Sequence, residues 1–380
     1  VAYIKRSIDD ELLSWMKDPS RKPLLLRGAR QVGKTTAVRA LAKRFKYFIE
    51  IDFNQSEADR ELFGSDVSTP KLWENLAAIH GVTSKPGKTL LFLDEIQACP
   101  AAVNRLRYFY EQIPELHVIA AGSLLEFVLE DLPSFGVGRV RSLFVYPLSF
   151  QEFLAALGKE TLGDLVRKAS PENPLLPAVH ETLTEMLRTF LVIGGMPEVV
   201  QEYVENHDLM KCQLILDELI TSFQDDFRKY SKRIPEARIN EVFNAVAKQG
   251  HGKFVYTKVG ERLKLTQVKA ALNLLILAGL VYPVTHTAAN GLPLGSEINE
   301  RYRRMILLDT GFMQRMQSLD LRALLQSTDF SAVNRGAVAE VFVGTELIKA
   351  QSAFTRSALW CWHKEDSRSQ AEVDDVVQSG

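Results

Sequence analysis

The segment Gly28–Thr35 constrains the fold of this chain more than any other feature of its sequence. It reads Gly-Ala-Arg-Gln-Val-Gly-Lys-Thr and lies between an apolar run, Pro23–Leu26, and a helical pattern, Thr35–Arg44. The two glycines allow backbone angles and a close approach that a Cβ would forbid. The loop amides and the helix N-terminus can then face an anion. A glycine turn with an incidental lysine is the alternative, but the flanking strand and helix are the context that a phosphate-binding loop needs.

We therefore expect this loop to bind ATP together with magnesium. The ammonium group of Lys34 is expected to reach the β- and γ-phosphates, and the hydroxyl of Thr35 is expected to ligate the magnesium ion. Arg30 could also touch a phosphate. The residues predicted to bind the nucleotide are Gly28, Ala29, Arg30, Gln31, Val32, Gly33, Lys34, Thr35 and Thr36.

An acidic pair lies further along the chain, where the apolar run Leu90–Leu93 ends in Asp94 and Glu95. After a phosphate-binding loop, this pattern is typical of a Walker B element. Asp94 would hold the magnesium ion through its water shell, and Glu95 would orient and activate the attacking water. A buried strand with a solvated acidic end gives the same pattern, but its place after the loop favours the catalytic interpretation. We therefore expect hydrolysis of ATP to ADP and phosphate.

Short apolar strands alternate with helical patterns through the first 150 residues. This alternation predicts an α/β fold in which helices cover both faces of a parallel sheet. From about residue 148 to about residue 233 the pattern is helical. The strands of the sheet are expected at Pro23–Leu26, Tyr47–Phe53, Thr89–Leu93, His117–Ala121 and Ser142–Tyr146.

Two polar residues near the later strands are further candidates for the catalytic site. Ser123 follows a strand, where its hydroxyl could sense the γ-phosphate or hold the water, although an ordinary strand-end serine is as good an interpretation. Arg139 precedes the last strand, and an arginine near a phosphate can spread the charge of the transition state. It could act within the chain or across a subunit boundary in a homo-oligomer, or it could be a solvated charge.

Together these residues resemble a prokaryotic family of AAA-type P-loop ATPases with an uncharacterised C-terminal domain. A strand between the two motifs along the chain, and a glutamate directly after the Walker B aspartate, are similar to the AAA-type division. The resemblance covers nearly the whole chain. The matching stretches are RGARQVGKTT, LFLDEIQACP, AAGSLLEF, VGRVRSLFVYPLSFQEF, GGMPEVV, LLDTGFMQR, GAVAEVFVGTEL and AEVDD.

The family implies an AAA-type P-loop ATPase core, followed by a helical lid, a winged helix and an α+β tail, which we expect to be truncated in this chain. The tail of the family resembles the nuclease fold that carries the PD-(D/E)xK motif. The expected domains are residues 1–150 for an N-terminal helix and the ATPase core, 151–236 for the lid, 237–290 for the winged helix, and 291–380 for an incomplete nuclease-like tail.

The winged helix is also predicted by the local pattern. Two helices are expected at Arg238–Lys248 and Thr257–Leu263. Thr266 would cap a third helix, and Gly279 would end it before the wing. In DNA-binding versions the polar side of that helix enters the major groove, but its few basic residues favour a structural role as a lid. The polar side consists of Gln267, Lys269 and Asn273.

The tail places Glu340 on an expected helix and Asp374 near the start of an expected strand. A nuclease of this class needs such acids to bind magnesium and a lysine on the next strand to activate water. The sequence ends at Gly380 before any such lysine, and Asp375 stands where the family more often has an aromatic residue. We therefore expect no nuclease activity, and a role for the tail in folding, assembly or partner docking.

The overall composition narrows the classes of function. A net charge of −1 over 380 residues gives no global attraction to nucleic acid or to a membrane. No apolar run is long enough to span a bilayer, so no membrane partner is expected. Three isolated cysteines and the lack of a signal peptide favour a reducing cytoplasm.

Three functions are compatible with these features. The first is an ATP-driven switch that controls an unknown macromolecular partner. The alternative is ATP-gated binding or processing of nucleic acid, with DNA as the partner of the winged helix. A structural ATP-binding scaffold is disfavoured because Lys34, Asp94 and Glu95 are all present.

Overall fold

A computed structural model of the chain describes residues 3–83, 85–123, 125–131, 138–230, 234–250, 252–260, 263–318, 335–364 and 371–378. The chain forms two compact units. Unit 1 contains Val1–Tyr146 together with the short segment Ala353–Arg356, and unit 2 contains Pro147–Ser352 together with Ser357–Gly380. The chain therefore passes between the units three times.

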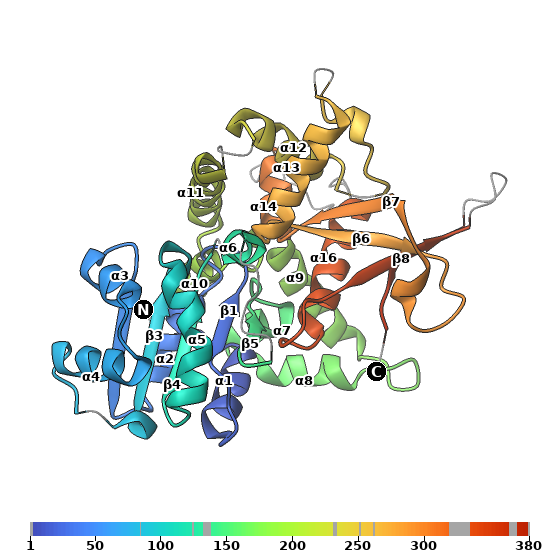
Figure 1. Ribbon diagram of the computed structural model, residues 1–380. Coiled ribbons are helices and arrows are strands. Elements are labelled where there is room, and N and C mark those ends of the chain that lie inside the picture. The colour runs from blue at the N-terminus through green and yellow to red at the C-terminus, as the bar shows by residue number, and fades with distance from the viewer. Residues whose placement is uncertain are drawn as a thin grey trace. The chain divides into compact units, whose positions relative to one another are not determined.

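Unit 1 is built on a five-stranded sheet in the order β2-β3-β4-β1-β5, and every neighbouring pair is parallel (Figure 1). This arrangement confirms the α/β fold with a parallel sheet. Each expected strand is present, and no strand end shifts by more than two residues. The strands are β1 (Leu24–Arg27), β2 (Tyr47–Asp52), β3 (Thr89–Asp94), β4 (His117–Ala121) and β5 (Arg141–Phe144).

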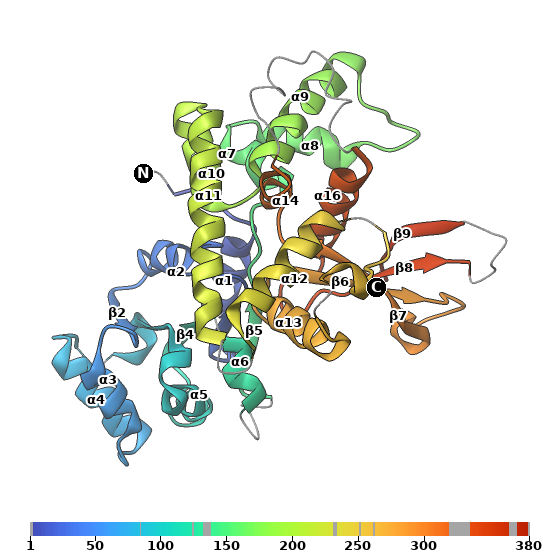
Figure 2. The same ribbon diagram turned by 90° about the horizontal axis from the view of Figure 1, so that it is seen from above.

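Helices cover both faces of this sheet, as Figure 2 shows, with α1 and α2 on one face and α3, α4 and α5 on the other. The central strands β3 and β4 are buried along their whole length, which their continuous apolar sequences require. The helices of unit 1 are α1 (Ile8–Lys17), α2 (Lys34–Ala42), α3 (Glu57–Gly64), α4 (Thr69–Ile79), α5 (Pro100–Gln112) and α6 (Leu125–Asp131), with 3₁₀ turns η1 (Pro86–Lys88) and η2 (Ile96–Ala98).

The strand order brings the two predicted motifs to the same edge of the sheet. The strand β4 lies between β1, which leads into the loop, and β3, which ends in the acidic pair. The strand β2, which separates the motifs along the chain, lies at the outer edge instead. Because all five strands are parallel, the loop, the acidic pair and the residues after β4 share the carboxyl edge, where open α/β sheets bind their ligands.

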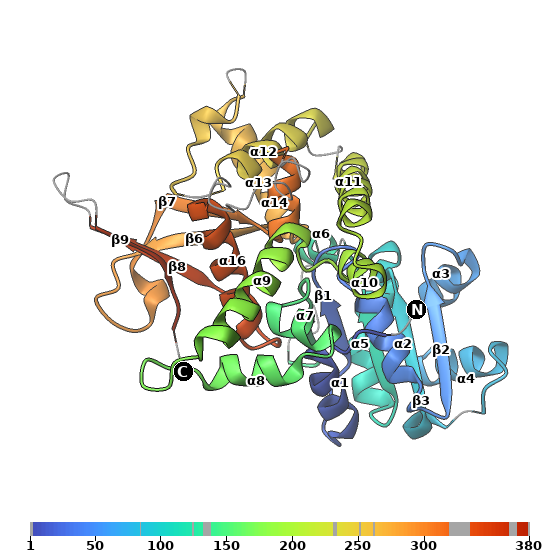
Figure 3. The same ribbon diagram turned by 180° about the vertical axis from the view of Figure 1, so that it is seen from behind.

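Unit 2 combines a helical part with a four-stranded sheet in the order β7-β6-β8-β9. The pair β6–β8 is parallel, whereas β6–β7 and β8–β9 are antiparallel. Figure 3 shows α16 running along one face of this sheet. The strands are β6 (Val281–Thr287), β7 (Ile298–Leu307), β8 (Leu359–His363) and β9 (Glu372–Val376).

The helical region expected from residue 148 onward is present. Its helices are α7 (Phe150–Ala156), α8 (Glu160–Lys168), α9 (Pro177–Ile193), α10 (Pro197–Asn206) and α11 (Leu209–Asp226), followed by the 3₁₀ turn η3 (Phe227–Tyr230). The later elements are α12 (Glu236–Lys248), η4 (Tyr256–Lys258), α13 (Leu265–Leu277), η5 (Leu294–Glu297), α14 (Thr310–Met316) and α16 (Arg335–Ala350).

The winged-helix region departs from its expected form in three ways. The second helix is described only as the 3₁₀ turn Tyr256–Lys258. Thr266 lies inside α13, and Lys264 holds the N-cap position, where its amide donates to the Gln267 side chain. The strand β6, expected as the wing, pairs with the tail strand β8, so the expected boundary after residue 290 divides a single sheet. Gly279, with φ of 73°, ends the helix as predicted.

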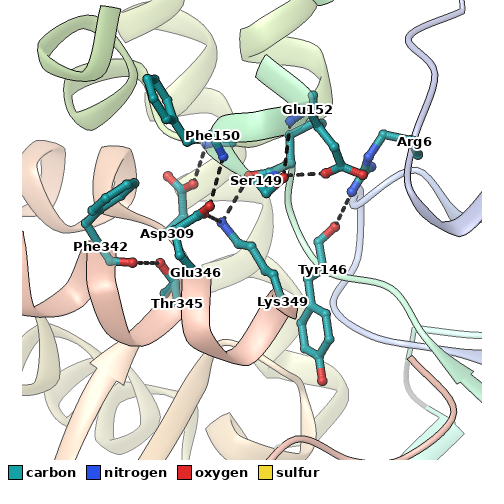
Figure 4. A network of polar contacts seen from close by, with 12 residues as sticks. Arg6, Tyr146, Ser149, Phe150, Glu152, Asp309, Phe342, Thr345, Glu346 and Lys349 are labelled. Carbon is teal, nitrogen blue, oxygen red and sulfur yellow. Dashed lines mark hydrogen bonds and ion pairs between the residues drawn. The ribbon is translucent and has the colours of Figure 1, made fainter. Parts of the chain in front are cut away.

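The segment that follows Tyr146 is anchored within unit 2 by a polar network (Figure 4). The amide of Leu148 donates to the carbonyl of Gly195 at 2.6 Å, and Lys349 on α16 donates to the carbonyl of Leu148 at 3.0 Å. The amide of Gly195 in turn donates to Asp309 at 2.6 Å. Burial raises the pKa of Asp309, while the amides that face it lower the pKa. The stretches VYPLSF, GGMP and LLDTG thus meet in one network.

Candidate functional site

The loop after β1 has the backbone that its two glycines predict. Gly28 has φ of 137°, and a Cβ at this position would collide with the carbonyl of Val145 beside β5. Gly33 has φ of 94° and is the N-cap of α2. The amides at the start of α2 are therefore directed into the loop, together with the positive end of the helix dipole. This cradle fits a phosphate group.

Lys34 is buried in the loop. Its ammonium group donates to the carbonyls of Gly28 at 2.9 Å and Ala29 at 2.7 Å. Burial lowers its pKa to about 8, against the opposing effect of Glu95 and Asp94 and with a smaller contribution from Arg30. A buried lysine whose pKa is lowered this far toward neutrality contributes little to stability as a charged group. Its environment of carbonyls and carboxylates instead suits a lysine that binds a polyphosphate.

Thr35 and Asp94 are in direct contact. The hydroxyl of Thr35 donates to Asp94 Oδ2 at 2.8 Å, and the amide of Glu95 donates to Asp94 Oδ1 at 2.9 Å. Burial raises the pKa of Asp94, whereas these two hydrogen bonds lower it. The hydroxyl and carboxylate oxygens predicted to hold magnesium therefore lie next to each other, and both are hard ligands of the kind that this ion prefers.

Glu95 occupies a left-handed backbone conformation, with φ of 49°, directly after β3. Its carboxylate accepts from Asn54 at 3.4 Å and from Gln97. Asn54 follows β2, and Gln97 lies in η2. Both are functional candidates that the sequence did not single out, because neither belongs to a motif. A polar residue directly after a strand of the predicted sheet was the available signal for Asn54.

Ser123 follows β4 at the same edge of the sheet as the loop. The register pairs Leu26 of β1 with Ala121 of β4, so the residues after both strands share the carboxyl edge of the sheet. Ser123 is buried, and a Cβ at the preceding Gly122 would collide with the Gln97 side chain. The catalytic role of Ser123 stays a prediction.

The structure does not bring Arg139 to the phosphate loop of its own chain. Arg139 precedes β5, and Arg141 at the start of that strand pairs with Leu24 at the start of β1. It therefore lies at the amino edge of the sheet, while the loop lies at the carboxyl edge, roughly 13 Å away for a four-residue strand. Its half-exposed side chain pairs with Glu111 at the end of α5. The interpretation within one chain is wrong for this arrangement, and action on a second copy stays a prediction.

Two further charged groups brace the loop and were missed from the sequence. The buried guanidinium of Arg6 donates to the carbonyl of Val32 at 3.2 Å and to the carbonyl of Tyr146 at 2.8 Å. Arg27, directly before Gly28, donates to both carboxylate oxygens of Glu126 on α6. Neither contact follows from spacing, because both join residues that are far apart along the chain.

The predicted tail acids face an internal cation. Arg304 on β7 is buried and pairs with Glu340 on α16 at 2.6 Å and with Asp374 on β9 at 2.7 Å. Burial raises the pKa of Asp375 to about 6, while Arg304 lowers it. Among the described residues, no group of three or more histidine, cysteine or acidic side chains is placed to hold a metal ion.

The polar side of α13 is partly used inside the protein. Gln267 accepts from Arg238 on α12 and from the amide of Lys264. The ammonium group of Lys269 lies 6.0 Å from the ring centre of Tyr256. Asn273 is exposed. The contacts of Gln267 favour the structural interpretation of this helix, and DNA binding stays a prediction.

Comparison with known proteins agrees with this geometry. Residues 20–154 match a family described as an AAA domain, and residues 184–323 match a family described as a domain of unknown function. No curated protein matches the chain. No helix within the described ranges is long and apolar enough to cross a membrane.

Among solved structures, a Walker-type ATPase of Pyrococcus abyssi superposes with a TM-score of 0.53 at 16% identity, over 83% of this chain and 96% of that chain. The two proteins therefore share a fold. PCH-2 of Caenorhabditis elegans gives a TM-score of 0.33 at 15% identity, over 55% of this chain and 66% of that one. ORC1 of Aeropyrum pernix, solved in complex with DNA, gives 0.29 at 12% identity, over 85% and 95%.

Proposed function

We propose that the AAA domain at residues 20–154 binds ATP with magnesium and hydrolyses it to ADP and phosphate. The observation that carries this proposal is the convergence of Lys34, the Thr35–Asp94 contact and Glu95 at the carboxyl edge of the sheet. Phosphoryl transfer to water needs a loop that binds the phosphates, a buried cation, a pair of oxygen ligands for a metal and a carboxylate beyond them.

Each of these residues has a separate role in the proposed reaction. The loop amides and Lys34 bind the phosphates and offset their charge. Thr35 and Asp94 hold the magnesium ion, which stabilises the charge that develops on the phosphate oxygens. Glu95 accepts the proton of the attacking water. Ser123 orients that water or the γ-phosphate from the neighbouring strand end.

The proposed biological role is a nucleotide-controlled switch that acts on a macromolecular partner through unit 2. The topology of the chain supports this role. The chain passes three times between unit 1, which contains the ATPase core, and unit 2. Switches of this kind need a differential interaction of the nucleotide with two states of the protein. ATP-gated binding of nucleic acid is the other candidate, and it is distinguished by whether duplex or single-stranded DNA changes the turnover of ATP.

The test separates binding from chemistry. Lys34→Ala should lose ATP binding by calorimetry, whereas Lys43→Ala, an exposed lysine at the end of the same helix, should bind as the wild type does. Glu95→Gln should bind ATP but turn it over at least ~100-fold more slowly, with the exposed Glu61→Gln as its control. Unchanged affinity in Lys34→Ala, or wild-type turnover in Glu95→Gln, would contradict the proposed site.

A further inference from the structure

The short segment Ala353–Arg356, here called the return segment, lies between α16 and β8 along the chain but belongs to unit 1. A single backbone hydrogen bond joins it to the sheet of that unit. The amide of Phe144 on β5 donates to the carbonyl of Ala353 at 2.7 Å. Since β5 is the last strand on its side of the sheet, the return segment contacts the outer edge of that strand.

The other end of the return segment makes an ion pair beside the phosphate loop. Arg356 donates to Glu126 Oε2 at 2.7 Å. Arg27 donates to both oxygens of the same carboxylate, and the next residue along the chain is Gly28. The side chains of Arg27 and Glu126 are only 19% and 12% exposed, whereas Arg356 is half exposed. The shared carboxylate is therefore shielded from water, which strengthens both of its ion pairs.

Arg27 also packs against β5, the strand that the return segment contacts. Its guanidinium lies 4.9 Å from the ring centre of Phe144 and donates to the hydroxyl of Ser142 at 3.2 Å. The guanidinium of Arg141, on the same strand, lies 5.3 Å from the ring centre of Phe354 in the return segment. Arg27 and the return segment therefore both contact β5, and both form an ion pair with Glu126.

The residues that flank the return segment along the chain are joined by hydrogen bonds within unit 2. The side chain of Gln351 donates to the carbonyl of Ala358 at 2.9 Å and accepts from the amide of Ala358 at 3.1 Å. The hydroxyl of Ser357 donates to the carbonyl of Ile348 on α16 at 2.9 Å. These contacts tie the end of the return segment to the last turn of α16 and to the residue before β8.

We propose that Glu126 and Arg356 are positioning residues that couple the phosphate loop to unit 2 through the return segment. This inference rests on the proposed function and names the route by which nucleotide acts on the second unit. Ordering of the loop around a bound nucleotide restrains Arg27, which restrains Glu126 and therefore Arg356. Coupling between two sites is reciprocal. Loss of the Arg356 contact must therefore weaken ATP binding by the same factor by which bound ATP stabilises the docked return segment.

The amide of Phe144 reports directly on the docked return segment, because it donates to Ala353. Hydrogen exchange of peptides that contain Phe144 is measured in the full chain, with and without ATP and magnesium, in Glu95→Gln, which is expected to bind without turnover. ATP should slow this exchange at least ~3-fold. With Arg356→Ala added, the ATP-dependent change should vanish, and ATP affinity should fall by a similar factor, about 3- to 5-fold. A contact that merely supports folding would not remove a nucleotide-dependent change.

The control is Arg167→Ala on the same background. Arg167 is another exposed arginine that pairs with a carboxylate, Asp164, but it lies on α8 in unit 2. It should leave both measurements unchanged. If ATP binds normally and Phe144 exchange responds equally in Arg356→Ala and in Arg167→Ala, the coupling inference is overturned and the proposed function stands. If the parent protein binds no ATP, the proposed function fails and the inference fails with it.

Discussion

The Thr35 hydroxyl donates a 2.8 Å hydrogen bond to Asp94 Oδ2, and this contact joins two motifs that lie far apart along the chain. The contact is possible because β1 and β3 both run parallel to β4, which lies between them, and so end at the same edge of the sheet. Asp94→Asn keeps the shape of the side chain but removes its charge. We expect it to weaken magnesium-dependent ATP binding about 10- to 100-fold, while binding without magnesium changes little. If EDTA weakens ATP binding as much in Asp94→Asn as in the wild type, the metal role of Asp94 is contradicted.

The pKa of Lys34 gives ATP binding a defined pH dependence. Burial lowers this pKa to about 8, so the cationic form that attracts phosphate is lost as the pH rises through 8. Above that pH, affinity should fall by up to ~10-fold per pH unit, since the neutral amine must first take up a proton. Calorimetric titrations between pH 7.5 and 9.5 measure this slope. Lys34→Arg, which stays charged, serves as the control and should lack the slope even if it binds more weakly.

The hydrogen bonds from Asn54 and Gln97 restrain the carboxylate that is expected to activate water. Both donors bind the same oxygen, Oε2 of Glu95, and so occupy an acceptor that could otherwise receive a hydrogen bond from water. We therefore expect Asn54→Ala to raise the basal turnover of ATP about 2- to 5-fold, with no change in ATP affinity. Gln55→Ala, which alters the neighbouring exposed side chain, is the matched control. A fall in turnover would instead assign Asn54 a supporting role in catalysis.

The sequence predicted the parallel sheet and the loop well because both rest on local patterns. An apolar strand, a glycine pair and a helix start are contiguous from Leu24 to Thr35, and burial on both sides makes β3 continuously apolar. Arg139 was placed wrongly for the opposite reason. Its position follows from the direction of β5 and its register with β1, which no local pattern encodes. The fusion of β6 with the tail strands likewise depends on pairing between residues that are distant along the chain.

Arg139 tests whether a second copy completes the site. Its half-exposed side chain lies at the amino edge of the sheet, so a role at a phosphate loop requires the loop of another chain. If it does, ATP turnover per chain should rise with protein concentration, and Arg139→Ala should lower turnover at least ~10-fold at high concentration while affinity is kept. Glu111→Gln, which removes the present partner of Arg139, should retain turnover. Turnover that is independent of concentration and insensitive to Arg139→Ala would sink this role.

The raised pKa of Asp375 predicts how the stability of the protein varies with pH. Burial raises this pKa from 3.8 to about 6, against the attraction of Arg304, so the folded state binds the proton more tightly than the unfolded state. The free energy of unfolding should therefore fall as the pH rises from about 4 to 6 and lose no more above that range. Asp375→Asn should be more stable than the wild type at pH 7.5, by on the order of 1–2 kcal/mol.

Urea unfolding at pH 5 and pH 7.5 measures this effect, and the advantage of the variant should be smaller at pH 5. Asp10→Asn, at an exposed site on α1, should show no such difference between the two pH values. An Asp375→Asn variant that is less stable than the wild type at pH 7.5 would show that the charged form of Asp375 is stabilised in the folded protein.

The last prediction concerns Arg304, whose buried guanidinium bridges Glu340 and Asp374. The two carboxylates expected to hold magnesium in a nuclease are both already paired with one cation of the protein itself. A divalent ion would have to displace Arg304 and leave its charge buried without a partner, which costs several kcal/mol. We therefore expect no cleavage of plasmid, single-stranded DNA or RNA with magnesium or manganese.

We also expect Arg304→Met to lower the free energy of unfolding by about 2 kcal/mol, less than for a fully buried pair because Asp374 is partly exposed. Arg303→Met, the neighbouring residue that pairs with the exposed Glu300, should cost less than ~1 kcal/mol. Metal-dependent cleavage by the wild type that disappears in Asp374→Ala would show that these acids hold a metal in spite of Arg304.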